Sequence, residues 1–552
     1  MRHEQNRAMG KPALLSSRIA RGVRPCGSLA MFFLAVAVWL SLSAAAFAHA
    51  SLVATEPTDG SVVSAAPSQF SLTFSEPVSV LALALIQPDG SNSALTRFLL
   101  RDHRLDIEAP ADLAQGTHVL SWRVVSADGH PVAGSVVFSV GAPSTAPPII
   151  TDAIDWPVRL AVWSGRLGLY LGLFFGVGGA FAIVWLAMGE TAGRAVVLRM
   201  LAIGVVGAVL SVGFQGLDAL GQPLQRIVDW RAWQAGLSTS FGSTALAAVS
   251  ACAIAIPGLA LKGLAARLLA LAALAGTGLA LALSGHASAA EPQWLTRPLV
   301  FLHGTTIAFW TGALIPLGLG LKRRGLAAVT TLCRFSRVIP FVVAVLICAG
   351  VMLALIQVQT PSALLHTTYG QVFLIKLGLL VFLFTLAVLN RWVLTEPIRR
   401  GDAGARRRLV RAIATETAIA VLIFGVAACW RFTPPPRALA IAAVEPAVTH
   451  IHTVKAMADL TLTPGRAGPI SGSIVVMTGD FGPLDAKEVT LVLSNEAAGI
   501  EPIRRPARKA GDGTWRIDGL ALPVAGKWKV RIDVLVSDFD LARLNGEVEI
   551  RP

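Results

Sequence analysis

Eight long apolar runs between residues 158 and 430 constrain this chain more than any other feature of its sequence. Each is long enough to cross the ~30 Å hydrocarbon core of a bilayer, which takes roughly 20 helical residues. Only 14% of the residues are charged, against about 25% in a typical soluble domain. The sequence therefore predicts an eight-helix transmembrane bundle in a lipid bilayer. The predicted limits are 158–187, 198–218, 241–261, 264–284, 298–320, 338–358, 371–393 and 410–430.

The basic residues between these runs predict how the bundle is oriented. If the first run enters from outside, the outer loops hold only Arg226, Arg231 and Arg297. All other loop arginines and lysines then fall inside, as the positive-inside rule requires. The net charge of +14 is thus explained by topology, and no nucleic-acid partner is expected. The inner loops hold Arg194, Arg199, Lys262, Arg267, Lys322, Arg323, Arg324, Arg334, Arg337, Arg391, Arg399, Arg400, Arg406, Arg407, Arg408 and Arg411.

Residues 1–48 have the composition of a secretory signal peptide. A basic segment precedes the apolar stretch "SLAMFFLAVAVWLSLSAAAFA", which ends in small residues typical of a cleavage site. We expect cleavage after Ala48, which makes His49 the first residue of the mature chain; the alternative is an uncleaved membrane anchor. With an even number of spans, both soluble ends then lie in the periplasm, and the membrane is the bacterial inner membrane.

Short alternating or β-branched runs with Pro, Gly and Asp turns predict a β domain on each side of the bundle. Residues 49–142 are expected to form a small β-barrel or sandwich of cupredoxin-like or immunoglobulin-like type, followed by a linker over 143–157. Residues 450–552 are expected to form an immunoglobulin-like β-sandwich. Neither segment contains cysteine, which excludes disulfide frameworks and thiolate metal sites there.

A histidine at the mature amino terminus is suited to binding copper(II). The α-amine and imidazole of His49 can chelate one ion, and nitrogen ligands in a tetragonal arrangement favour copper(II). The segment "SADGHPV" supplies Asp128 and His130, whose side chains point the same way in an extended chain. No methionine lies between residues 50 and 150, so we expect no thioether site for copper(I). Taken alone, His130 could also be a solvated turn residue.

Two further groups of residues are candidates for copper. His286, His303 and His366 lie at the outer ends of predicted spans and form a candidate membrane copper path, although each alone could be an interfacial histidine. In "VTHIHTVKAM", His450 and His452 have the spacing that places two imidazoles on one side of a strand. Together with Met457 they form a candidate C-terminal copper site, and the alternative is a polar strand start.

Three charged residues fall within otherwise apolar spans. Arg166 and Lys376 are functional candidates because charges are costly in a membrane. Both could instead snorkel toward the outer headgroups, and we favour snorkelling. For Glu416, near the inner end of the last run, we expect pairing with nearby arginines.

The motifs resemble known copper-handling families. Residues 49–142 resemble the periplasmic CopC copper-binding proteins through His49, "EPTDGSVV", "LTFSEPV" and "WRVVSADGHPVAGSVVFSV". This resemblance implies copper(II) ligation by His49, Asp128 and His130. Residues 158–430 resemble the CopD family through "SGHAS", "LHGTTIAFWTGAL" and "TTYGQVFLIKLGLLVFLFTLAVLNRW", and the C-terminal part is similar to a YtkA-like domain.

These features predict periplasmic copper binding and copper import across the inner membrane, as part of copper homeostasis or resistance. Periplasmic copper chaperones are expected partners. The chain is not expected to be an enzyme, and it has no GxxxxGK[ST] motif for an ATP motor. Two alternatives remain at this stage: a copper oxidoreductase built on the N-terminal histidine chelate, and a haem protein with axial ligands among the membrane histidines.

Overall fold

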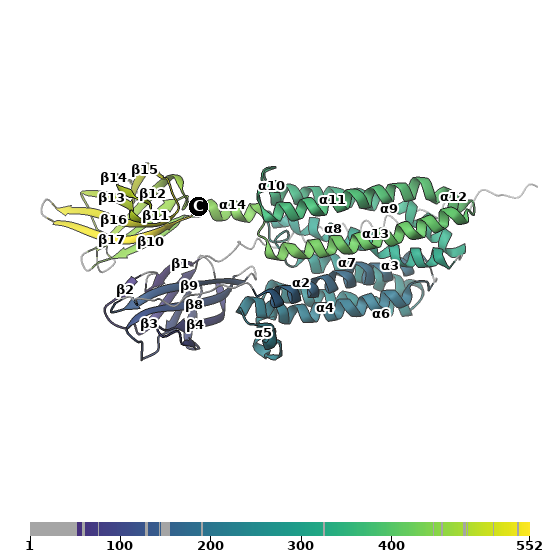
Figure 1. Ribbon diagram of the computed structural model, residues 1–552, viewed down its shortest axis with the longest axis horizontal. Helices are drawn as coiled ribbons and strands as arrows, with labels where there is room; N and C mark the ends of the chain where they lie inside the picture. Colours follow the sequence, from purple (N-terminus) through teal and green to yellow (C-terminus); the bar gives the residue numbers. More distant parts are fainter. Residues whose placement is uncertain are drawn as a thin grey trace, which may run out of the picture.

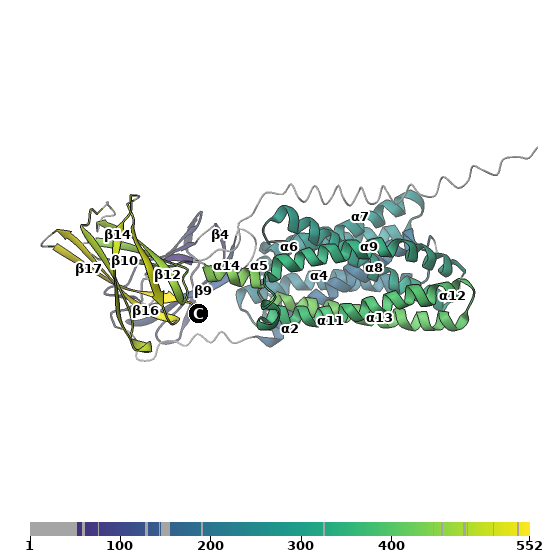
Figure 2. The same ribbon diagram turned by 90° about the horizontal axis from the view of Figure 1, so that it is seen from above.

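The computed structural model shows two β domains at one end of a long helix bundle (Figures 1 and 2). The predicted order of β domain, eight apolar helices and β domain is confirmed. The structure describes residues 52–57, 61–74, 77–126, 131–142, 144, 155–188, 191–323, 326–444, 446–453, 456–478, 482, 484–511, 513–537 and 540–551.

The N-terminal β domain consists of two sheets with strand orders β1-β3-β7-β6 and β2-β9-β8-β4-β5. Every second residue of β3, namely Phe70, Leu72 and Phe74, faces the space between the sheets. There Phe74 packs edge-on against Trp122, with ring centroids 5.2 Å apart. The strands are β1 (Leu52–Glu56), β2 (Ser61–Val63), β3 (Gln69–Phe74), β4 (Val78–Ile86), β5 (Asn92–Ala94), β6 (Phe98–Arg101), β7 (Arg104–Glu108), β8 (Gly116–Ser126) and β9 (Pro131–Val140).

Eight helical segments of the bundle are long and apolar enough to cross a membrane, as the sequence predicts. The first and seventh each contain a π-helical segment. The elements are α2 (Trp156–Leu171), η1 (Gly172–Val177), α3 (Gly178–Trp185), α4 (Arg194–Leu220), η2 (Leu224–Val228), α5 (Trp230–Ser238), α6 (Ser240–Ala260), α7 (Gly263–Ala282), α8 (Gln293–Lys322), α9 (Leu326–Val358), α10 (Ala363–His366), α11 (Thr368–Leu389), η3 (Asn390–Leu394), α12 (Thr395–Arg399), α13 (Ala403–Cys429), η4 (Trp430–Phe432) and α14 (Pro436–Val444).

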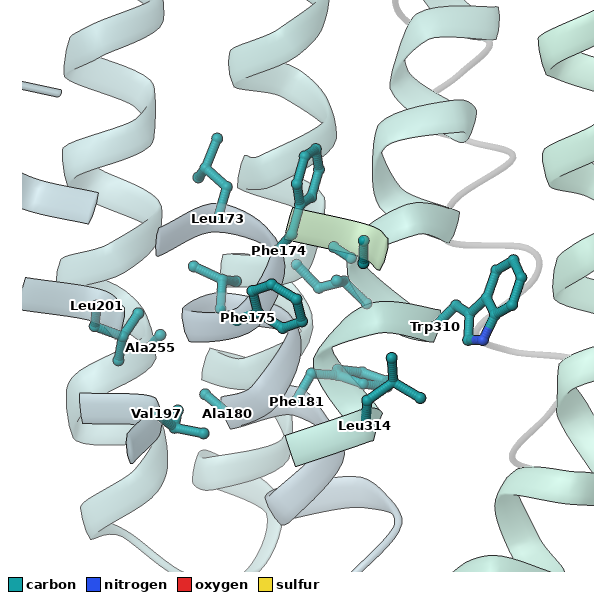
Figure 3. Close-up of a cluster of buried hydrophobic side chains, with 14 of the residues drawn as sticks. Leu173, Phe174, Phe175, Ala180, Phe181, Val197, Leu201, Ala255, Trp310 and Leu314 are labelled. Atoms are coloured by element: carbon teal, nitrogen blue, oxygen red, sulfur yellow. The ribbon is translucent and has the colours of Figure 1, made fainter. Parts of the chain in front are cut away.

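The first span lies at the centre of the bundle and is packed through small residues. Any side chain at Gly172 would collide with the backbone of Gly204 on α4, and one at Gly178 with the backbone of Ala308 on α8. Such close helix approach is the usual role of small residues in membrane interfaces. Large side chains of the same span, including Phe175 and Phe181, fill the core beside α4 and α8 (Figure 3).

Helices α9 and α11 are the least enclosed of the bundle. Only 11% and 6% of their most apolar windows are buried, against 72% for the first span. Helix α9 packs on α8, and α11 packs on α13. Both therefore lie at the periphery of the bundle, where a membrane protein meets lipid.

The C-terminal domain follows helix α14, which begins at Pro436. Proline is favoured in the first helical turn because its missing N–H would have no partner there. Eight strands form one sheet of order β10-β11-β12-β15-β14-β13-β16-β17. Strand β10 also contacts β17, so the domain is barrel-like. The strands are β10 (Ala447–His452), β11 (Ala456–Thr463), β12 (Gly468–Thr478), β13 (Glu488–Asn495), β14 (Ile500–Lys509), β15 (Trp515–Leu522), β16 (Gly526–Ser537) and β17 (Asp540–Ile550).

Candidate functional site

A cavity of about 870 Å³ lies in the half of the bundle nearer to the β domains (the outer half). Helices α2, α4, α6, α7, α8, α9, α11 and α13 all contribute to its wall. Aromatic side chains such as Phe174, Trp310 and Phe384 line its deeper part. A cavity of this size and mixed polarity is typical of a binding site for a small ligand.

Two of the three predicted membrane histidines line this cavity. His303 lies on α8, and its Nδ1 is 3.3 Å from the carbonyl oxygen of Leu346 on α9. A carbonyl only accepts, so in the neutral ring Nδ1 carries the proton and Nε2 keeps its lone pair. This type of hydrogen bond fixes the tautomer and the ring orientation of metal-binding histidines.

The cavity's second histidine, His286, follows α7. Its backbone carbonyl accepts a hydrogen bond of 3.1 Å from the side-chain amide of Gln357 on α9. This bond ties the His286 turn to the same helix that orients His303. The third histidine, His366, lies at the end of α10, is exposed, and is not among the residues that line the cavity. The structure thus brings together His286 and His303 without His366.

Arg166 and Lys376 also line the cavity, where we expected them to reach toward the headgroups. The guanidinium of Arg166 lies 5.4 Å from the ring centroid of Phe241, and the ammonium of Lys376 lies 4.5 Å from that of Trp430. Both are favourable cation–π distances. The snorkelling prediction is wrong because both side chains line the cavity, where aromatic rings cover their charged groups.

Most of the other charged residues at the cavity wall are also positive. Arg123, Arg159 and Arg431 contribute to the wall, and Asp218 is the one acidic residue among the described lining residues. A carboxylate oxygen of Asp218 lies 2.7 Å from a guanidinium nitrogen of Arg431, and both side chains of this ion pair are largely buried. The cavity is therefore electropositive.

Glu416 lies deeper in the membrane, one helical turn from Ala420, which lines the cavity. Its carboxylate accepts a 2.6 Å hydrogen bond from the side-chain amide of Asn390, at the start of the π-helical segment η3. Glu416 is only 4% exposed. Our expectation of an arginine partner is wrong, because Asn390 of η3 faces Glu416 across the helix contact, while Arg391 turns away to Ser336.

The N-terminal domain sits over the mouth of the cavity. Arg123 of β8 donates a 3.3 Å hydrogen bond to the carbonyl of Ala219 at the end of α4. Arg123 and Val132 of β9 both line the cavity. These residues stand near the end of the β8–β9 hairpin, so that end of the domain faces the bundle. The predicted copper ligands His49, Asp128 and His130 lie outside the described residues.

In the C-terminal domain, the register of β10 and β11 pairs His450 with Asp459 and His452 with Met457. The Nδ1 of His450 is hydrogen-bonded to the carboxylate of Asp459, and this bond raises the pKa of His450. Met457 is buried, and the side chain of His452 is outside what the structure describes. Asp459 was missed from the sequence, although the antiparallel register of a hairpin could have suggested it.

No group of three His, Cys, Asp or Glu side chains within the described ranges is placed to hold a metal ion. This holds for the pairs His286–His303 and His450–Asp459, each of which would need further ligands. The copper site predicted in the N-terminal domain is not tested by this observation, since its ligands are not described.

A soluble β domain seated on the mouth of a membrane cavity defines a multi-pass membrane protein with an attached outer domain. Residues 52–141 match the CopC domain family, and residues 329–430 match the family of copper resistance protein D. The chain therefore belongs to the copper resistance proteins, with a CopC domain and a CopD domain in one polypeptide.

Two individual relatives agree with this assignment. The chain is 26% identical over 535 residues to the copper transport protein CutJ of Bacillus subtilis (strain 168), covering 90% of this chain and 94% of that protein. It is 35% identical over 120 residues to copper resistance protein C of Xanthomonas campestris pv. juglandis, covering 18% of this chain and 84% of that protein. The solved structure of CopC from Methylosinus trichosporium OB3b aligns with 27% identity and a TM-score of 0.16, covering 18% of this chain and 99% of that structure.

Proposed function

We propose that this protein binds copper(II) in the periplasm and passes it into the membrane cavity for import across the bacterial inner membrane. His49, Asp128 and His130 would hold the ion in the outer domain, as the CopC resemblance implies. His286 and His303 would receive it. Both β domains would lie in the periplasm, where a copper chaperone could deliver the ion.

The observation that carries this proposal is the position of the β8–β9 hairpin at the mouth of the cavity. Residues 127–130, which include Asp128 and His130, connect β8 to β9 in the sequence. Arg123 and Val132, on either side of that connection, line the same cavity as His286 and His303. An ion released from the hairpin would thus enter the bundle without crossing open periplasm, and a tethered donor acts at high effective concentration.

Cellular copper content tests the proposal. Cells that express the protein should accumulate more copper than cells without it, and His49→Ala should abolish the difference because it removes the imidazole of the chelate. The matched control is His103→Ala, an exposed histidine of the same domain that pairs with Asp102. Equal copper content in cells with the wild-type protein, with His49→Ala and with no protein would contradict import.

The haem alternative has one observation in its favour, since His286 and His303 line a single cavity. Two such histidines could act as axial ligands. An absorption spectrum of the purified protein separates the two functions: a Soret band that is lost in His303→Ala would favour haem, and its absence in protein that binds copper would favour the copper path.

A further inference from the structure

The membrane cavity carries positive charges that the protein itself does not neutralise. Among the described residues, Asp218 is the one acid at the wall, and it is already paired with Arg431. Neither Arg166 nor Lys376 forms an ion pair with any described residue. Unpaired charges in a membrane interior are costly and mark functional sites.

Of these two cations, Arg166 has the stronger requirement for an anionic partner. A guanidinium stays charged under all physiological conditions, so the cavity always contains this cation. Its Nε is buried and has no hydrogen-bond partner in the described part of the protein. The ring of Phe241 covers one face of the group, and Tyr170 is within hydrogen-bonding reach of it, which leaves Nε and the remaining in-plane N–H donors for a ligand. A planar fork of donors matches the oxygens of a carboxylate or phosphate.

Lys376 borders the cavity from α11. Its ammonium lies over Trp430, while Arg431, the next residue, stands on the side of Asp218 and α2. Both cations thus border one cavity, with the end of α13 between them. A copper ion at His286 and His303 would meet these positive charges, and an anion in the cavity would offset the repulsion.

We propose that the cavity binds a ligand that carries a carboxylate or phosphate group, with Arg166 and Lys376 supplying positive charge from two walls of the cavity. The ligand would share the cavity with His286 and His303, but the proposal does not rest on copper transfer.

The ligand can come from two sources that share this chemistry. An anionic lipid could enter from the side, because Ile347 and Val351 of α9 and Leu377 and Val381 of α11 line the cavity and are exposed apolar residues at the periphery. A soluble anion could instead enter at the mouth beneath the β8–β9 hairpin. The test therefore has one arm for each source.

The lipid arm uses native mass spectrometry of the full-length protein, purified in detergent and supplied with phosphatidylglycerol or phosphatidylcholine. The soluble arm uses calorimetric titration of the protein, in phosphatidylcholine nanodiscs, with inorganic phosphate. The variants are Arg166→Gln, Lys376→Gln and the double substitution. Arg226→Gln is the matched control, because it removes an exposed outer charge that does not line the cavity.

We expect selective retention of phosphatidylglycerol, or binding of phosphate, with affinity reduced roughly 10- to 100-fold by either cavity substitution and unchanged by Arg226→Gln. Retention in the lipid arm alone would identify a lipid, and binding in the phosphate arm alone a soluble anion. If Arg166→Gln fails to fold, Lys376→Gln alone decides. No binding to the wild type in either arm, or equal binding by wild type and cavity variants, would overturn the proposal, whatever the copper measurements show.

Discussion

The outer and inner halves of the membrane domain hold charged residues in two different ways. The outer half surrounds a cavity and contains Arg166 and Lys376, each against an aromatic face. Beyond the cavity, the bundle is filled by packed side chains such as Phe175 and Phe181 (Figure 3), and its buried acid, Glu416, is held by one amide donor. Charge is thus tolerated in this bundle either beside space for a ligand or beside a fixed polar partner.

The difference indicates where a ligand can enter. A ligand can enter the cavity from the N-terminal domain. It cannot pass through a close-packed core unless the side chains there rearrange. In the proposed import, this cavity would receive the copper ion from the N-terminal domain.

The largest effect is expected where the packing is tightest. Gly178→Leu places a side chain against the backbone of Ala308 and should destabilise the bundle by about 3 kcal/mol or more, since backbone cannot yield as a side chain does. Denaturant unfolding in micelles measures this. Ala354→Leu, on the cavity wall, should cost less than about 1 kcal/mol. Equal costs at the two positions would contradict the division into a packed and an open half.

A smaller effect is expected at the buried acid. Glu416→Ala removes the acceptor of the Asn390 amide and should cost about 1–3 kcal/mol, the penalty for an unsatisfied buried donor. Glu416→Gln keeps an acceptor oxygen at the same place and should cost less than Glu416→Ala in the same unfolding measurement. If the two substitutions are equally costly, the Asn390 bond is not what holds Glu416.

The smallest effect concerns pH and the C-terminal domain, outside the membrane. Asp459 raises the pKa of His450 above its ordinary 6.5, so protonated His450 stabilises the folded domain. This contribution is complete below about pH 6.5 and is lost as the pH rises through the folded-state pKa. The unfolding temperature of the wild type should therefore exceed that of Asp459→Asn by the largest margin at about pH 6 and by the smallest at about pH 9. A gap that widens with pH would contradict the pairing.

Much of the fold was predictable from the sequence, because spanning length and β-alternation are local properties. The eight spans and the two flanking β domains required no knowledge of packing. The surroundings of single residues were less accessible. Arg166 and Lys376 were expected to snorkel, since the sequence of one helix does not indicate a cavity that eight helices form together. The partner of Glu416 was missed because Asn390 lies 26 residues away on another helix.

The candidate site was predicted only in part for the same reason. The outer ends of the spans indicated His286, His303 and His366, but depth alone does not say which helices meet. Only contacts between α8, α9 and the turn after α7 separate His286 and His303, inside the cavity, from His366 on the exposed helix α10.

The most direct test of copper transfer through the cavity is copper uptake by proteoliposomes that contain the full chain with its β domains outside. We predict that His303→Ala reduces uptake to the level of protein-free liposomes, while His366→Ala, which alters a histidine outside the cavity, transports at the wild-type rate. Uptake by His303→Ala at the wild-type rate, or a loss of uptake only in His366→Ala, would contradict the account.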